Sequence, residues 1–155
     1  MKQSNAITID VEDYFQVSAF ENTIDRNNWD NLEHRVGANI DQSLQVLSDH
    51  SVKATFFTLG WVAERYPDIV TKIIENGHEL ASHGYGHQRV SDLNRLEFKA
   101  DLIKAKDILE DISGQAIAGY RAPSYSIGKS NIWALKVLAE TGHSYSSSIY
   151  PIQHD

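Results

Sequence analysis

The chain alternates between short strand-like segments and helix-like segments, and this alternation is the strongest constraint on its fold. Two of the joints between a helix and the next strand are near-copies, Glu75-Asn76-Gly77-His78 and Glu140-Thr141-Gly142-His143. In each joint a glycine follows the end of the helical stretch, which is typical of a left-handed C-cap. A repeated strand-helix order with short joints predicts an α/β fold in which helices pack outside a parallel sheet.

The spacing of apolar residues assigns the individual segments. Helices are predicted over Asn39–Ser48, over Trp61–Glu75, from Ser91 or Asp92 to Ile112, and over Asn131–Glu140. Strands are predicted over Ala6–Asp10, Lys53–Leu59, His78–Ser82, Ala116–Arg121 and Tyr145–Tyr150. The polar segment Gln16–Gly37 interrupts the alternation, and we interpret it as an ordered excursion held by Phe20 and Trp29.

This number of strands limits the architecture. A closed parallel barrel normally needs about eight strands, so the sheet is either open or the first part of a longer domain. The ending Pro151–Asp155 has no terminating feature, and we therefore expect residues 1–155 to be the N-terminal part of a single, truncated domain. An unclosed sheet exposes apolar edges, and homo-oligomerisation is one way to cover them.

Composition excludes several classes of protein. The net charge is −7 and no Lys/Arg-rich run occurs, so the chain is not expected to bind nucleic acid. It has no cysteine, which excludes disulfides and thiolate metal sites. No apolar run approaches the length of a membrane span, and the polar start Met1–Asn5 does not resemble a signal peptide. We therefore expect a cytoplasmic protein without a membrane partner.

The string Ser82–His87 (SHGYGH) places two imidazoles four residues apart, directly after a predicted strand. Gly84 and Gly86 argue against a helix here, but a glycine-rich loop can also turn both rings inward. Two neutral imidazoles and one carboxylate leave open positions on a divalent metal, as in catalytic zinc sites. The alternative is that His83 and His87 are surface loop residues.

Three carboxylates at the end of the first strand could complete such a site. Asp10 ends an apolar strand, where an unpaired carboxylate is costly, so we expect it to contact either a metal or Arg121. Alternation places Asp10 and Glu12 on the same side of an ideal strand, with Asp13 just beyond. The alternative is that these carboxylates cap backbone amides of the following turn.

Arg121 ends the fourth predicted strand and precedes Ala122-Pro123, where the proline favours a rigid extended turn. The carboxyl ends of parallel strands meet at one edge of the sheet, and functional groups gather there. We therefore expect Arg121, the carboxylates and the imidazoles to converge on one rim. His78 and His143 fall at the opposite edge, and we interpret them as structural.

Three motifs in this order resemble the NodB-type polysaccharide deacetylases, carbohydrate esterase family 4: Thr8–Asp13 (TIDVED), Ser82–His87 (SHGYGH) and Tyr120–Ser126 (YRAPSYS). The stretch Ile7–Phe20 resembles the bacterial branch found with exopolysaccharide loci. The resemblance implies a distorted parallel (β/α) barrel of NodB type, a divalent metal that is usually zinc, and hydrolytic removal of N-acetyl groups from a polysaccharide or oligosaccharide.

The resemblance also implies roles for single residues. His83 and His87 become metal ligands, and Asp10 becomes the base that takes a proton from a metal-bound water. The family's usual metal-binding aspartate directly follows the base, but Val11 stands there. The carboxylate ligand is therefore Glu12, which alternation favours, or Asp13, which side-chain type favours.

The same resemblance implies roles for two further residues. Arg121 would orient Asp10, and the backbone amide of Ser124 would help to stabilise an oxyanion. Independently of the resemblance, Tyr125 is predicted with Ser124 to bind the substrate, because tyrosines can line a sugar-binding cleft; the alternative is that it is an ordinary core or rim residue.

The chain also departs from the family pattern. The late Leu-x-His motif that carries the general-acid histidine is missing before Asp155, and His154 does not match it. Ser146 replaces the aspartate that tethers the arginine, which predicts a less fixed Arg121, and Gly84 replaces the usual Ser or Thr. Two alternatives follow: a non-catalytic remnant that binds metal or glycan, and an amidohydrolase of the same fold that acts on a small amide.

Overall fold

The computed structural model of the chain describes residues 5–150, so the predicted chain ending, with His154, lies outside the described residues. Five strands form one parallel sheet whose spatial order follows the chain. They are β1 (Thr8–Val11), β2 (Thr55–Thr58), β3 (Glu79–Ser82), β4 (Gly119–Tyr120) and β5 (Tyr145–Ser146). The α/β fold with a parallel sheet is therefore confirmed.

The last two strands are shorter than predicted, because beyond β4 a hydrogen bond to a side chain takes the place of backbone pairing between the strands. The N–H of Ala122 donates to the Ser148 hydroxyl at 2.9 Å instead of to a backbone carbonyl of β5. The next residue, Pro123, has no N–H to donate. The chain therefore leaves the sheet two residues after β4, and it turns at the rim where we expected the site.

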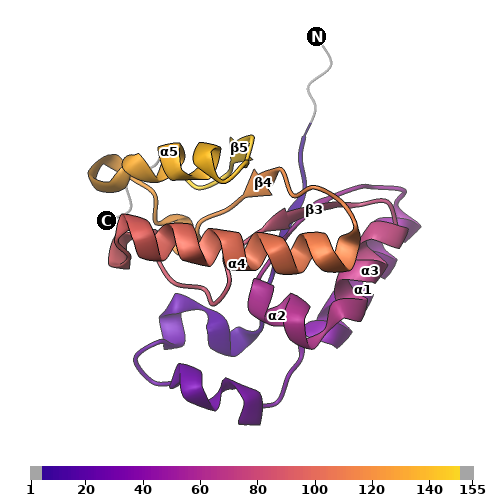
Figure 1. Cartoon of the computed structure of the whole chain (residues 1–155). Coiled ribbons are helices and arrows are strands. Elements are labelled where there is room, and N and C mark those ends of the chain that lie inside the picture. Colours follow the sequence, from indigo (N-terminus) through magenta and orange to yellow (C-terminus); the bar gives the residue numbers. More distant parts are fainter. Residues whose placement is uncertain (1–4, 151–155) are drawn as a thin grey trace.

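The α-helices are α1 (Val36–Asp49), α2 (Gly60–Arg65), α3 (Pro67–Glu75), α4 (Arg95–Ser113) and α5 (Trp133–Glu140). The long helix α4, at the front of Figure 1, packs against α2, α3 and α5, and α1 packs against α3. The single helix predicted over Trp61–Glu75 is wrong. The chain breaks at Tyr66 (φ −131°, ψ 63°), because the residue before a proline is disfavoured in the helical region.

Helix α4 also begins later than predicted. Its N-cap is Asn94, whose side-chain oxygen accepts hydrogen bonds from the N–H groups of Leu96 and Glu97. The Glu97 carboxylate in turn accepts from the N–H of Asn94, which completes a capping box. The predicted caps, Ser91 and Asp92, belong instead to a separate 3₁₀ turn, η4 (Val90–Asp92).

The predicted excursion is ordered and forms three 3₁₀ turns, η1 (Tyr14–Gln16), η2 (Ser18–Phe20) and η3 (Arg26–Asn31), at the bottom of Figure 1. Trp29 holds it in place: it is buried and packs against Phe15 and Trp61 at ring separations of 5.8 and 5.5 Å. Phe20 is 44% exposed, so its predicted anchoring role is wrong. An aromatic cluster rather than a sheet contact therefore fixes the excursion.

The sheet is curved, although it does not close. In a flat sheet β1 and β4 would lie about 14 Å apart, at about 4.8 Å per strand. The guanidinium of Arg121, one residue after β4, nevertheless contacts the carboxylate of Asp10 on β1 at 2.7 Å. Among the described residues, no helix combines the length and apolarity that a membrane span needs.

Candidate metal centre

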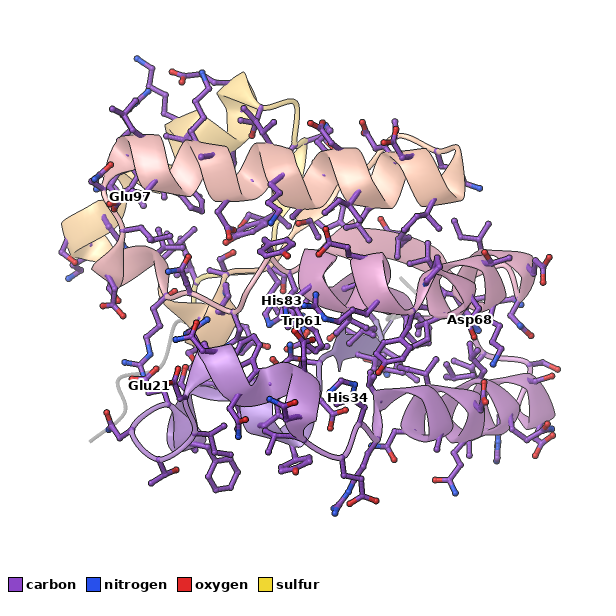
Figure 2. All side chains as sticks on the ribbon, turned by 60° about the horizontal axis from the view of Figure 1, so that its bottom comes forward. Glu21, His34, Trp61, Asp68, His83 and Glu97 are labelled. Carbon is purple, nitrogen blue, oxygen red and sulfur yellow. The ribbon has the colours of Figure 1, made fainter. Side chains whose placement is uncertain are left out.

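Glu12, His83 and His87 come together at the carboxyl edge of the sheet, and each offers a ligand atom within 4.8 Å of the others. Glu12 directly follows β1, and His83 directly follows β3. The N–H of His83 donates to the Thr58 carbonyl of β2, which continues the ladder one residue past β3. In Figure 2 His83 lies in the middle of the molecule, between the excursion and α4.

The His83 ring is held in one orientation. Its Nδ1 lies 2.8 Å from the backbone carbonyl of Arg121, and the opposite atom, Nε2, faces Glu12 at 3.8 Å. Burial lowers the pKa of His83, so the ring is neutral at neutral pH. A neutral imidazole with one nitrogen bonded to a carbonyl and the other pointing into the site has the arrangement of a metal ligand.

Glu12 and His87 form the other side of the cluster. The Nε2 atom of His87 lies 2.9 Å from Oε2 of Glu12, yet this buried oxygen has no hydrogen-bond partner. Burial alone raises the pKa of Glu12, but its contact with His87 brings the pKa below the ordinary value. A buried, ionised carboxylate oxygen without a hydrogen bond, facing two imidazoles, fits a divalent cation such as zinc.

The structure separates Asp13 from the cluster that it was predicted to join. Its carboxylate accepts hydrogen bonds from the N–H groups of Tyr14, Arg35 and Val36, at 2.7 to 3.0 Å. Asp13 thus caps η1 and meets the start of α1, as the alternative reading of these carboxylates required. Of the two carboxylates that were predicted as metal ligands, only Glu12 lies with the histidines.

Asp10 takes Arg121 as its partner. The Nη1 atom of Arg121 donates to Asp10 Oδ1 at 2.7 Å, and the guanidinium lies 4.0 Å above the ring of Phe57 on β2, one of the two strands between β1 and β4. Phe57 is the register partner of Asp10, so the arginine crosses its ring to reach the carboxylate. The arginine is buried, whereas the side chain of Asp10 is 28% exposed.

Arg121 is firmly fixed, contrary to the expectation from Ser146. Its Nη2 donates to the hydroxyls of Thr8 and Ser147, both at 2.9 Å, and its Nε donates to the Ser147 carbonyl. Ser146 itself bonds to Ser148. Two hydroxyls and a carbonyl therefore hold the guanidinium where the family uses an anion, and Asp10 is its only charged partner among residues 5–150.

The turn after Arg121 has an unusual backbone. Ser124 (φ 53°) and Tyr125 (φ 50°) both adopt the left-handed region within η5 (Pro123–Tyr125). Such strain in residues other than glycine is rare and gathers at functional sites. Both residues line an open groove of about 1360 Å³ that runs from this turn along η6 (Lys129–Asn131) to Tyr150.

Sequence reasoning missed several residues that support the site. Thr8 and Ser147 hold Arg121, and no local pattern marks them. Asp101 accepts hydrogen bonds from the N–H of Tyr85, between the two histidines. A signal for Asp101 existed, because it falls on the apolar stripe of α4 with the buried residues Phe98, Leu102 and Ala105.

Comparison with known sequences places this geometry in context. Residues 23–146 match the family model for polysaccharide deacetylase. A peptidoglycan-N-acetylglucosamine deacetylase of Bacillus cereus is 38% identical over 92 residues, which cover 59% of this chain and 34% of that protein. A peptidoglycan deacetylase of Helicobacter pylori is 28% identical over 110 residues, 71% of this chain and 36% of that protein. The chain thus spans about a third of the length of these curated relatives.

Solved structures share the fold. A crystal structure of the Bc1960 peptidoglycan N-acetylglucosamine deacetylase superposes with a TM-score of 0.67 at 28% identity, over 91% of this chain and 54% of that chain. A family 4 pseudoenzyme from Bacillus anthracis, BA3943, superposes with the same TM-score at 20% identity, over 91% of this chain and 41% of that chain. The second likeness concerns the fold alone.

Proposed function

Because the chain belongs to the polysaccharide deacetylase family of NodB-type carbohydrate esterases, we propose that it carries the metal site and the base of a hydrolase that removes N-acetyl groups from a glycan. One observation carries the proposal: a carboxylate and two imidazoles converge within 4.8 Å at the rim that also holds the Asp10–Arg121 pair. This is the arrangement that an open, hydrolytic metal site requires.

Glu12, His83 and His87 would hold the ion, for which zinc is the first candidate. When bound, the ion would lower the pKa of a water molecule and polarise the acetyl carbonyl. Asp10, held at the same rim, would accept the proton of the attacking water. Arg121 aims the Asp10 carboxylate through its contact at 2.7 Å.

The groove beside Arg121 is the proposed site for the sugar. Tyr125 lies under the guanidinium of Arg121, at 5.3 Å, and is 40% exposed to the groove. Its ring offers a face for a sugar, and the left-handed turn at Ser124 presents a backbone amide for the developing oxyanion. Because Ile7–Phe20 resembles the exopolysaccharide branch, an N-acetylated exopolysaccharide is the first natural substrate to test.

Release of acetate from an N-acetylated chitooligosaccharide, with zinc added, tests the proposal. We expect release by the native chain, its loss in His83→Ala, and a decrease of at least about 100-fold in Asp10→Asn, the usual effect of removing a general base. His50→Ala is the matched control, since His50 is exposed at the end of α1. Absence of release by a native chain that binds zinc would contradict catalysis.

A second candidate function is binding of metal and glycan without turnover. Val11 favours it, because it stands where the resembled family has its metal-binding aspartate, and Glu12 lies with the histidines instead. Under this alternative the same oligosaccharide would bind the native chain, and binding would weaken in Tyr125→Ala, while no acetate would be released. Calorimetric titration of the oligosaccharide, run beside the acetate assay, separates the two candidates.

A further inference from the structure

The loop between the two histidines forms hydrogen bonds with side chains and with a helix end that do not belong to the metal cluster. The N–H groups of Gly60 and Trp61, at the start of α2, donate to the carbonyls of Gly84 and Tyr85, both at 2.9 Å. The next two carbonyls, of Gly86 and His87, accept from the guanidinium of Arg26 in the excursion. Every carbonyl from Gly84 to His87 is thus fixed by a donor outside the loop.

Asp101, in the middle of α4, accepts from the backbone of the same loop. Both of its carboxylate oxygens accept from the N–H of Tyr85, at 3.2 and 3.1 Å. The carboxylate is largely withdrawn from solvent, and this burial raises the pKa of Asp101 to about 6. A buried acid on the apolar stripe of a helix is destabilising unless a partner compensates for its lost hydration.

Gly84 shows how closely the carboxylate approaches the loop. A Cβ atom at this position would lie 2.8 Å from Oδ2 of Asp101, and the backbone has a φ of +75°. The residue after the first histidine is therefore glycine for two reasons, the left-handed backbone and the space that the carboxylate takes.

We propose that Asp101 and Arg26 are positioning residues that fix the loop between His83 and His87 and thereby preorganise the metal site. Asp101, on α4, accepts a hydrogen bond from a backbone N–H of the loop, and Arg26, in the excursion, donates to two of its carbonyls. His87 needs such support, because its backbone is itself left-handed (φ 54°) and its buried Nδ1 has no hydrogen-bond partner. The inference rests on the metal site of the proposed function.

Zinc affinity is the direct test, measured by competition with a chromophoric chelator. Asp101→Asn should weaken zinc binding by about tenfold or more, the usual effect of losing a group that orients a ligand. Asp107→Asn is the matched control, since Asp107 is an exposed aspartate of the same helix. Arg26→Gln, in the excursion, is the second variant and should weaken zinc binding in the same direction.

Two further readouts separate positioning from general stability. In the metal-free protein, the amide of Tyr85 should exchange with solvent faster in Asp101→Asn than in Asp107→Asn. With Co²⁺ in place of zinc, the visible spectrum of Asp101→Asn should change, because the ligand geometry changes. Faster exchange with unchanged affinity and spectrum would overturn the proposal, since Asp101 would then be merely structural.

The remaining outcomes are also decisive. If the amide of Tyr85 exchanges at the same rate in Asp101→Asn and Asp107→Asn, the proposal is overturned. If Asp101→Asn does not fold, Arg26→Gln decides: a zinc affinity within twofold of the native value would overturn the proposal. A native chain that binds no metal would overturn it together with the proposed metal site. A native chain that binds zinc but releases no acetate would contradict only the catalytic function.

Discussion

Glu12 and Asp13 are neighbours in the chain, but their carboxylates contact different kinds of group in the folded protein. Glu12 faces two imidazoles with a buried oxygen that lacks a hydrogen bond, whereas Asp13 accepts from three backbone N–H groups. A carboxylate saturated with amide donors stabilises the fold, and an unsaturated one beside imidazoles is ready for a cation. Substitution of the two residues should therefore affect different properties.

We expect Glu12→Gln to weaken zinc binding by at least about tenfold, because even the loss of a residue that only orients a metal ligand has an effect of that size. The free energy of unfolding of the metal-free protein should remain nearly unchanged. Asp13→Asn should lower the free energy of unfolding by about 1–3 kcal/mol through the loss of charged caps and keep zinc affinity within twofold. Urea unfolding and zinc titration measure the two effects. A large loss of zinc affinity in Asp13→Asn would contradict the assignment of Glu12.

Arg121 differs from the surface arginines in the number and burial of its partners. Arg121→Lys should lower the free energy of unfolding by about 2–3 kcal/mol, because an ammonium cannot reach Asp10, Thr8 and Ser147 together and buried acceptors lose their donors. Arg95→Lys is the control, since its ion pair with Glu140 is exposed and should contribute little. Equal effects in urea unfolding would argue against this account.

At the residue scale, the sequence indicated every member of the metal cluster but could not choose between Glu12 and Asp13. Strand alternation favoured Glu12, and the structure places Glu12 with the histidines. The contact between Arg121 and Thr8 was not predictable, because the two residues are 113 positions apart and meet only through the curvature of the sheet. A contact across such a separation leaves no local pattern.

At the scale of elements, the sequence predicted the order of strands and helices, while proline and capping chemistry decided where they end. Pro67 divides one predicted helix into α2 and α3, and Asn94 rather than Ser91 caps α4. Both signals were present in the sequence as a proline inside a helical stretch and as an Asn-x-x-Glu capping box. The helical spacing of apolar residues continues across both boundaries, so a prediction from this spacing alone places the helix ends incorrectly.

The cap of α4 can be tested by paired substitutions. Asn94→Ala should lower the free energy of unfolding by about 1 kcal/mol, since two N–H groups in the first turn lose their acceptor. Ser91→Ala should change it by less than about 0.5 kcal/mol, as is usual for an exposed surface residue. Thermal or urea unfolding of both variants measures the difference, and the reverse ranking would restore the predicted helix start.

At the scale of the whole molecule, stability should depend on pH through buried histidines. His143 packs edge to face with the ring of Tyr120, and burial, with the nearby charge of Lys106, lowers its pKa to about 4. The unfolded chain takes up a proton near pH 6.5, but the folded chain does not until about pH 4. The free energy of unfolding should therefore decrease as the pH falls through this window.

Substitution isolates this contribution. Between pH 7 and pH 5, we expect the native chain to lose on the order of 1 kcal/mol more stability than His143→Gln, because glutamine cannot take up the proton. Asp101 acts with the opposite sign, since its pKa is raised, so the comparison must be made between the two proteins rather than on the native chain alone. If urea unfolding shows that both proteins lose the same free energy of unfolding between the two pH values, His143 does not cause the pH dependence.

The chain-ordered sheet has a consequence for assembly during synthesis. Each strand pairs with the one made just before it, so the sheet can grow from β1 to β5 as the polypeptide leaves the ribosome, without a strand having to insert between two others. Glu12 emerges first, the two histidines follow, and Arg121 comes late. Arg121 therefore becomes fully held only after β5 has been made, when Ser147 can accept hydrogen bonds from its guanidinium.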